Sequence, residues 1–164
     1  MPTRATSLRI GVLLALMAAV AVSAAVWAGT GLAGARHVTK TPTVMTRKVG
    51  KLGVILVNGA GHTRYMFVPD KQTKVTCKGS CVFIGPPLKI KAGQKPTAGG
   101  AAKKALLGTV KNPGGGRVVT YNRWPLYTYI TDHKAGQATG QGVNNSGGLW
   151  YVLSPSGKVI KTKP

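Results

Sequence analysis

A long apolar stretch opens the chain. Arg4 and Arg9 precede a run without any charged residue that extends to residue 35. A basic start followed by an apolar centre is typical of a secretory signal. An uncharged run of this length can also remain in place as a membrane-anchoring helix, with both arginines on the cytoplasmic side. We therefore expect residues 1–35 to be a signal peptide or an N-terminal anchor helix that contacts the membrane at least transiently. The rest of the chain is then extracytoplasmic, either secreted or tethered.

The chain after residue 35 consists of short apolar runs separated by turn-forming residues. Residues 36–51 are rich in Thr, Lys and Val without a helical period, which indicates a linker or a first edge strand. A first unit, residues 52–88, follows. Its start predicts a hairpin, with strands at 52–57 and 63–68 around an Asn-Gly turn.

A second unit of the same kind occupies residues 106–155, after a Gly- and Lys-rich connection at 89–105 that we expect to be flexible. A basic tail, residues 156–164, ends the chain. No sustained helical period occurs between residues 36 and 164, so we predict an all-β fold, a small antiparallel barrel or sandwich built from both units. The strands predicted in the second unit are at 106–110, 118–121, 126–130 and 149–153.

Both units contain the phrase Tyr-x-aromatic-x-x-Asp, which indicates an internal repeat. The two aspartates that close it are the only acidic residues of the chain. Alternation along a strand places the aromatic residues on one face, where they are expected in the core. The six motif residues are Tyr65, Phe67 and Asp70 in repeat one and Tyr127, Tyr129 and Asp132 in repeat two.

The two aspartates admit three interpretations. In the one that we favour, each carboxylate accepts backbone N–H groups in the turn that ends its strand, or pairs with a nearby cation, and so fixes the paired repeats. In the second, Asp70 and Asp132 meet as an acid-protease dyad, but the residues after them lack the small hydroxyl and glycine pattern of such a site. The third is a calcium site, which two carboxylates in a strongly cationic chain do not favour.

Repeat two also carries motifs that resemble a known bacterial family. The resemblance covers about residues 52–155, and it implies an exported protein of two repeats without an established activity. In repeat one, Arg64 stands where the family favours Leu, and Gly85 stands where a Trp usually precedes two prolines. The segments that carry it are Leu-Gly-Thr-Val at 107–110, Val-Thr-Tyr-Asn-Arg-Trp-Pro-Leu-Tyr at 119–127, Gly-Gln-Gly at 140–142 and Leu-Trp-Tyr-Val at 149–152. Together with Asp132 they resemble the secreted-repeat lipoprotein family of unknown function.

The formal charge of +21 results from missing acids, because Lys and Arg together number 23 against two Asp. The basic residues are spread along the chain without a run of five or six, unlike a nucleic-acid-binding arm. Export also removes nucleic acid as a partner. We expect a surface that adheres to an anionic cell-envelope polymer or lipid surface. Adaptation to an acidic exterior, where carboxylates titrate, is the alternative explanation.

Cys77 and Cys81 are the only cysteines. A disulfide is the usual state outside the cytoplasm, and a four-residue separation requires a turn between the cysteines. The alternative is an extracytoplasmic copper or redox protein, in which both thiolates bind Cu(I) with help from Met66 or His62. The histidines share no metal spacing, so we expect neither a metal nor another cofactor.

The aromatics of repeat two have two interpretations. Tyr121, Trp124 and Trp150 suit either the core of a small β domain or a stacking platform for an envelope glycan. No catalytic motif is visible in the sequence. We therefore expect a non-enzymatic cell-envelope protein with a binding or structural role, and copper or glycan binding as the alternatives.

Overall fold

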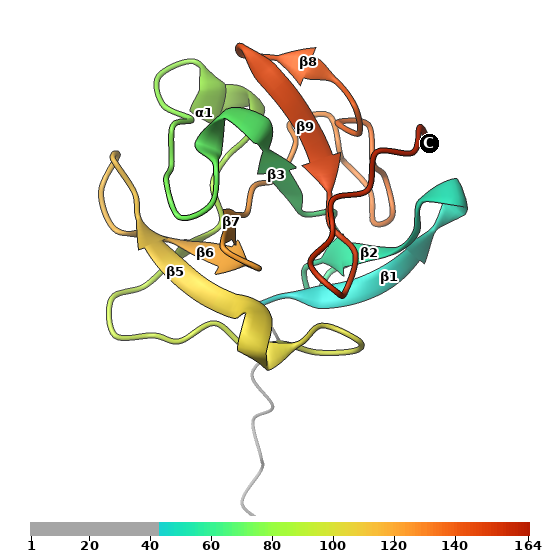
Figure 1. Ribbon diagram of the computed structural model, residues 1–164, viewed down its shortest axis with the longest axis horizontal. Helices are drawn as coiled ribbons and strands as arrows, with labels where there is room; N and C mark the ends of the chain where they lie inside the picture. Colours follow the sequence, from blue (N-terminus) through green and yellow to red (C-terminus); the bar gives the residue numbers. More distant parts are fainter. Residues whose placement is uncertain (1–42) are drawn as a thin grey trace, which may run out of the picture. The chain divides into compact units, whose positions relative to one another are not determined.

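The computed structural model describes residues 43–164 (Figure 1). The signal or anchor segment expected at 1–35, and the start of the range 36–51, lie outside the described residues. Within residues 43–164, no helix is both long enough and apolar enough to cross a bilayer.

In repeat one, the strand predicted at 52–57 forms a β-hairpin with Met45–Val49, a strand within the range 36–51 that was expected to be a linker or a first edge strand. The return strand predicted at 63–68 meets it only at the isolated bridge of Val57 with Thr63. Val57 pairs with Met45 and Gly53 with Val49, so that the β-branched run forms the inner strand. Gly53, where the hairpin turns, has a positive φ of 71°, a backbone conformation that glycine adopts without strain. The elements of this repeat are β1 (Met45–Val49), η1 (Gly50–Leu52), β2 (Gly53–Val57), β3 (Tyr65–Phe67), η2 (Val68–Asp70) and the single-turn helix α1 (Cys81–Ile84).

Repeat two has a matching hairpin, in which Lys111 pairs with Arg117 and Leu107 with Tyr121. The connection at residues 89–105, which was expected to be flexible, is hydrogen-bonded to Val44. The backbone N–H of Val44 donates to the carbonyl of Thr97 at 3.0 Å, and its carbonyl accepts the N–H of Gly99 at 2.9 Å. The elements from residue 89 onward are β4 (Lys89–Ile90), η3 (Lys104–Leu106), β5 (Leu107–Lys111), β6 (Arg117–Tyr121), β7 (Trp124–Pro125), β8 (Asn144–Asn145) and β9 (Gly148–Val152).

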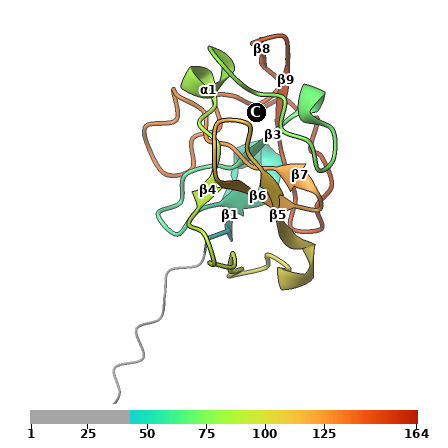
Figure 2. The same cartoon turned by 90° about the vertical axis from the view of Figure 1, so that its left-hand side faces the viewer.

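The described strands form three small sheets, which confirms the all-β prediction but gives no closed barrel within residues 43–164. β1 and β2 form the first sheet, β3, β9 and β8 the second, and β4, β6 and β5 the third, with β7 also paired to β6. Figure 2 shows β4, β6 and β5 side by side below α1. Two clusters of buried side chains fill the space between the sheets, and the aromatic one contains Tyr65, Tyr127 and Trp150.

The predicted strand at 126–130 was wrong. β7 ends at Pro125, and beyond it Tyr127 makes only isolated bridges. Thr128 and Ile130 donate to the carbonyls of Pro86 and Ile84, at 3.0 and 2.9 Å. Pro86 and Pro87 have no N–H to return, so a regular ladder cannot continue along this pair of segments.

The two repeats exchange hydrogen bonds at matching positions. The N–H of Leu56 in repeat one donates to Leu153 in repeat two at 3.1 Å, and the N–H of Val119 in repeat two donates to Leu88 in repeat one at 2.8 Å. Leu56 thus corresponds to Val119, and Leu88 to Leu153. Because these bonds connect the repeats in both directions, neither repeat can complete its backbone hydrogen bonding alone.

Gly85 corresponds by this register to Trp150, and the indole of Trp150 lies where a Gly85 side chain would be. A Cβ placed on Gly85 would come within 2.2 Å of the indole. The same ring packs on Phe67, with centroids 4.5 Å apart, and meets Tyr127 edge-on at 5.5 Å. The Trp150 side chain therefore fills the space that a side chain at the corresponding position of repeat one, Gly85, would need.

We predict that Gly85→Ala destabilises the protein by about 2–3 kcal/mol, because the added methyl group collides with a fully buried ring. Gly114→Ala is the matched control: its Cβ would meet nothing closer than 3.6 Å and its φ is ordinary, so its effect should stay within about 0.5 kcal/mol. Urea unfolding of both variants measures the difference. Equal midpoints would contradict the packing described above.

Candidate functional site

Tyr65 and Tyr127, the first residues of the two motifs, meet in the buried core. Each donates its backbone N–H to the carbonyl of the other, at 2.9 Å in both directions. Both residues are completely buried. A mutual pair of this kind is the contact expected across a local twofold axis, so the duplicated motif marks the junction between the repeats.

The side chains of the two motifs are connected crosswise. The hydroxyl of Tyr65 donates to Oδ2 of Asp132 at 2.6 Å, and the hydroxyl of Tyr127 donates to Oδ2 of Asp70. Each tyrosine therefore binds the aspartate of the other repeat, and not the one that closes its own motif.

The second oxygen of each carboxylate holds the loop that follows it. Oδ1 of Asp70 accepts the backbone N–H and hydroxyl of Thr76, at 2.7 and 2.9 Å, and the N–H of Cys77 at 3.1 Å. Oδ1 of Asp132 accepts the N–H and hydroxyl of Thr139, at 2.8 and 2.6 Å. The donors are neutral groups, so hydrogen bonds and not ion pairs hold both carboxylates.

These contacts suppress tyrosine ionisation. Burial raises the pKa of Tyr65 well above its ordinary value, and the hydrogen bond to Asp132 and the charge of that residue raise it further. For Tyr127, burial is again the main cause, followed by the charge of Asp70 and the hydrogen bond to it. The phenols thus act as permanent donors at physiological pH.

The two aspartates do not form the dyad considered as their second interpretation. Asp70 and Asp132 bind separate tyrosines, and no hydrogen bond joins the two carboxylates as an acid-protease dyad would require. Among residues 43–164, no three His, Cys, Asp or Glu side chains cluster as metal ligands. Phe67 and Tyr129, the middle residues of the motifs, are buried in the aromatic core.

The residues of the copper alternative are not brought together. A disulfide joins Cys77 to Cys81, with Cα atoms 5.3 Å apart, and in that form neither sulfur is a thiolate. Met66 lies in a different cluster of the core from the cysteines. His62 is half-buried, and only its backbone is held, by the side chain of Asn58 at 2.8 Å.

The aromatics proposed as a glycan platform lie mainly in the core. Tyr121 and Trp150 have no exposed surface. The hydroxyl of Tyr121 donates to Pro155 at 2.7 Å, and the indole N–H of Trp150 donates to Asn145 at 3.2 Å. Trp124 is only half-buried and packs against the second core cluster. This burial leaves neither Tyr121 nor Trp150 a face on which a sugar could stack.

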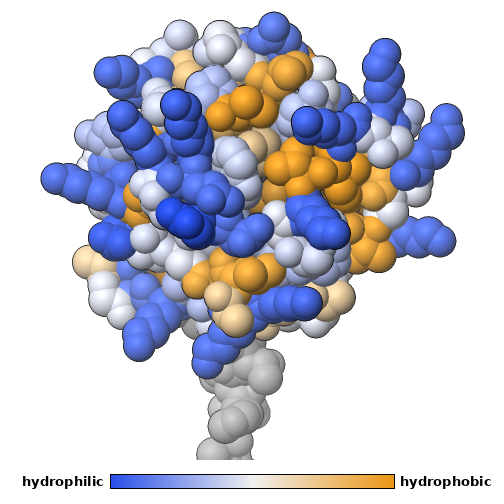
Figure 3. All heavy atoms as spheres, in the orientation of Figure 1, coloured by the Kyte–Doolittle hydropathy of each residue, from blue (hydrophilic) through white to orange (hydrophobic). Residues whose placement is uncertain are grey.

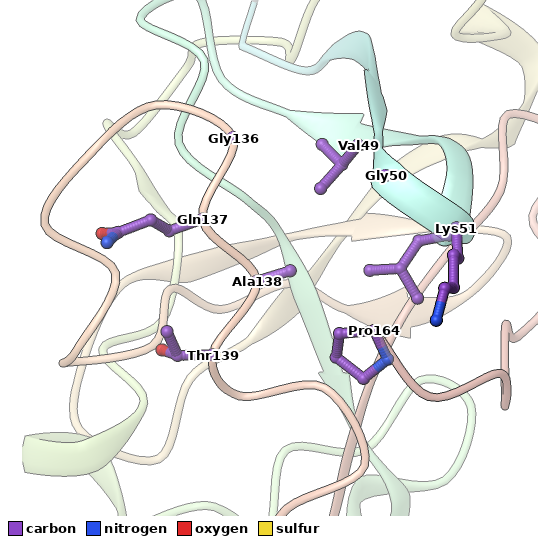
Figure 4. A pocket seen from close by; sticks show the side chains of 9 residues that line it. Val49, Gly50, Lys51, Gly136, Gln137, Ala138, Thr139 and Pro164 are labelled. Atoms are coloured by element: carbon purple, nitrogen blue, oxygen red, sulfur yellow. The ribbon is translucent and has the colours of Figure 1, made fainter.

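Two clefts lie where the hairpin turn of one repeat faces the loop after the aspartate of the other. The first, of about 320 Å³, lies between residues 49–52 and 136–139 (Figure 4). Val49 and Ala138 point into it from opposite sides, and Pro164 lies at its edge. The second, of about 490 Å³, lies between the turn at Asn112 and the disulfide loop. Its lining includes Lys78 and Lys89, which makes it the more cationic of the two.

Two features of the site were not predicted from the sequence. The spacing of the motif indicated a repeat, but it did not indicate that the tyrosine of each repeat binds the aspartate of the other. Arg64, at the position that corresponds to Leu126, is 5% exposed, and its Nε has no hydrogen-bond partner. Burial lowers the pKa of Arg64 to about 10. The departure from Leu was visible in the sequence, but its burial was not.

Residues 108–154 match a protein family described as a secreted repeat of unknown function. This match confirms, for repeat two, the family resemblance that its motifs indicated. No curated protein and no solved structure matches the chain.

A double-mutant cycle tests the crossed pairing. We expect Tyr65→Phe and Asp132→Ala to couple by about 1.5–3 kcal/mol, the usual contribution of a hydrogen bond to a charged group. The control cycle combines the same Asp132→Ala with Tyr127→Phe, which binds the other aspartate, and should couple by less than about 0.5 kcal/mol. Free energies of unfolding in urea supply both values. Stronger coupling in the control cycle would mean that each motif pairs within its own repeat.

Alkaline pH should unfold the protein through the same two phenols. Above about pH 10 an unfolded tyrosine loses its proton. Tyr65 and Tyr127 keep theirs while folded, so each should cost about 1.4 kcal/mol of stability per further pH unit. Absorbance at 295 nm should show these two of the five tyrosines ionising only as the circular dichroism signal is lost. Tyr65→Phe should remove one late-ionising group. Ionisation of all five near pH 10 in a folded protein would contradict this account.

Proposed function

We propose, from the match of residues 108–154 to a secreted repeat family, that the protein is an exported, non-catalytic cell-envelope domain that adheres to anionic material through its whole cationic surface. The family description supports export, and it attaches no reaction to the repeat. The expected signal or anchor at residues 1–35 agrees with an extracytoplasmic location, whether or not it is cleaved.

The observation that carries this proposal is the separation of charges. Every lysine among residues 43–164 is exposed, and so are Arg47, Arg117 and Arg123. Asp70 is fully buried, and Asp132 is partly buried with both its oxygens hydrogen-bonded. The described surface thus presents cations with no exposed acidic side chain to neutralise them.

The cations are distributed and do not form one patch. Figure 3 shows hydrophilic side chains projecting over the whole visible face, with separate hydrophobic areas between them. A field of one sign attracts a polyanion from many directions and is screened by salt. This favours adhesion to a polymer or surface of repeated negative charge over recognition of a single small ligand.

A non-catalytic role agrees with the duplicated motif. Its hydroxyl and carboxylate groups are paired with each other or with backbone N–H groups, and the tyrosines and Asp70 are buried. A nucleophile or a general base needs a polar atom that can reach substrate. We therefore assign the motif a role in stability.

Binding to immobilised polyglycerol phosphate, with neutral dextran beads as the control, tests the proposal. We expect retention on the phosphate polymer alone, with elution between about 0.1 M salt, where the Debye length is ~10 Å, and about 1 M, where it is ~3 Å. Equal retention on dextran, or retention unaffected by 1 M salt, would overturn electrostatic adhesion as the function.

A further inference from the structure

The single turn of α1 exposes the largest apolar side chain on the described surface. Phe83 is 72% exposed, while its neighbour Cys81 is buried and tied by the disulfide to Cys77. Because the disulfide fixes the base of this turn, Phe83 is held outward on a rigid support. Exposure of most of a phenylalanine side chain is unfavourable in water and indicates a surface that meets an apolar environment.

A second apolar side chain lies on the same part of the molecule. Ile130 is 50% exposed, and its N–H donates to the carbonyl of Ile84, the residue after Phe83, at 2.9 Å. Ile84 and the exposed Pro86 continue the surface along the same segment. Phe83, Ile84, Pro86 and Ile130 thus lie on two backbone-bonded segments, one from each repeat, and we call these four residues the α1 tip.

Cations border the α1 tip. Val82 of α1 lines the 490 Å³ cleft together with Pro86, Lys78 and Lys89. Both lysines are exposed. The apolar tip and the cationic cleft therefore adjoin each other: they share Pro86, and Val82 in the cleft precedes Phe83 of the tip.

We propose that the α1 tip docks on an anionic lipid bilayer, with Phe83 and Ile130 entering the boundary between headgroups and acyl chains and with Lys78 and Lys89 binding lipid phosphates. This proposal rests on the proposed adhesion to anionic material and names its partner. Apolar groups beside cations are the combination that binds a membrane interface, since each lysine near the surface adds electrostatic attraction.

Charge complementarity favours a bilayer over other partners. A hydrophilic anionic polymer would use the lysines but leave Phe83 and Ile130 in water. A second copy of this chain would bring two cationic surfaces together, which like charges oppose. A lipid surface satisfies the apolar and the cationic side chains at once.

The experiment is co-sedimentation with vesicles of phosphatidylglycerol and phosphatidylcholine mixed in equal parts, and with vesicles of phosphatidylcholine alone. Each variant is expressed from the complete coding sequence and purified after export, whether or not residues 1–35 have been removed, so that all variants share one N-terminus. We expect Phe83→Ser to weaken binding to the anionic vesicles roughly tenfold, as for loss of one buried aromatic side chain. Val54→Ser, on β2, is the matched control: Val54 is 42% exposed, and its replacement should have no effect.

The lysines are tested with two double variants that have the same net charge as each other. Lys78→Gln with Lys89→Gln should weaken binding roughly fivefold per lysine. Lys103→Gln with Lys104→Gln removes the same charge beside η3, which lies at the end of the described body away from α1 in Figures 1 and 2, and should have a smaller effect. Circular dichroism verifies that each variant is folded.

The outcomes separate the two proposals. Equal weakening by both lysine pairs, with no effect of Phe83→Ser, would overturn docking through the α1 tip and leave general adhesion. Retention on polyglycerol phosphate without any vesicle binding would overturn the bilayer as partner. Binding to neither would overturn the proposed function itself. Concentration-dependent dimers that Phe83→Ser abolishes would identify the tip as a contact between copies, and would also overturn membrane docking.

Discussion

The crossed hydrogen bonds between Tyr65 and Asp132, and between Tyr127 and Asp70, are the constraint on which the fold depends. They lie beside the backbone pair that joins the two tyrosines, and each aspartate also holds the loop that follows it. One carboxylate thus links three parts of the chain: the strand it ends, the loop after it and the tyrosine of the other repeat. Hydrogen bonds to charged groups contribute about 1.5–3 kcal/mol each, against a typical total stability of 5–15 kcal/mol. Loss of either pair would remove a large share of that total.

The departures from symmetry show how two copies of one unit became a single core. Two tryptophans at corresponding positions would occupy the same space near the local axis, and Gly85 opposite Trp150 resolves that conflict. Arg64, which stands where the family favours Leu, has no such compensation. The Nε atom of Arg64 is buried without a hydrogen-bond partner, and desolvation lowers the pKa of Arg64. A buried cation of this kind costs stability relative to a well-packed leucine. Repeat one is therefore well packed at Gly85, while its buried polar defect lies at Arg64.

Much of this architecture could be predicted from the sequence, and the limits have physical causes. Alternation and turn residues predicted the strands at 52–57 and 118–121, and the shared motif predicted the repeat. The hairpin partner predicted for 52–57 was wrong, because β2 pairs with β1 and meets the segment 63–68 only through the isolated bridge of Val57 with Thr63. The strand predicted at 126–130 does not form, because the alternation pattern describes only that segment. A strand ladder also needs N–H donors in the neighbouring segment, and there Pro86 and Pro87 have none. The crossing of the motifs could not be predicted for a related reason. Spacing determines which residues share a face, but it does not determine which copy of a duplicated unit supplies the partner.

The position of the two aspartates also bears on why the surface lacks acids. An acidic exterior would make any carboxylate undependable, yet the fold relies on two of them as acceptors for neutral donors. Carboxylates are therefore retained where the interior needs an acceptor, and they are missing where they would only face solvent. The proposed adhesion accounts for that distribution. An anionic partner would act only on the exposed side chains, among which the described residues have no acid, and it would leave the crossed pairs of the interior unaffected.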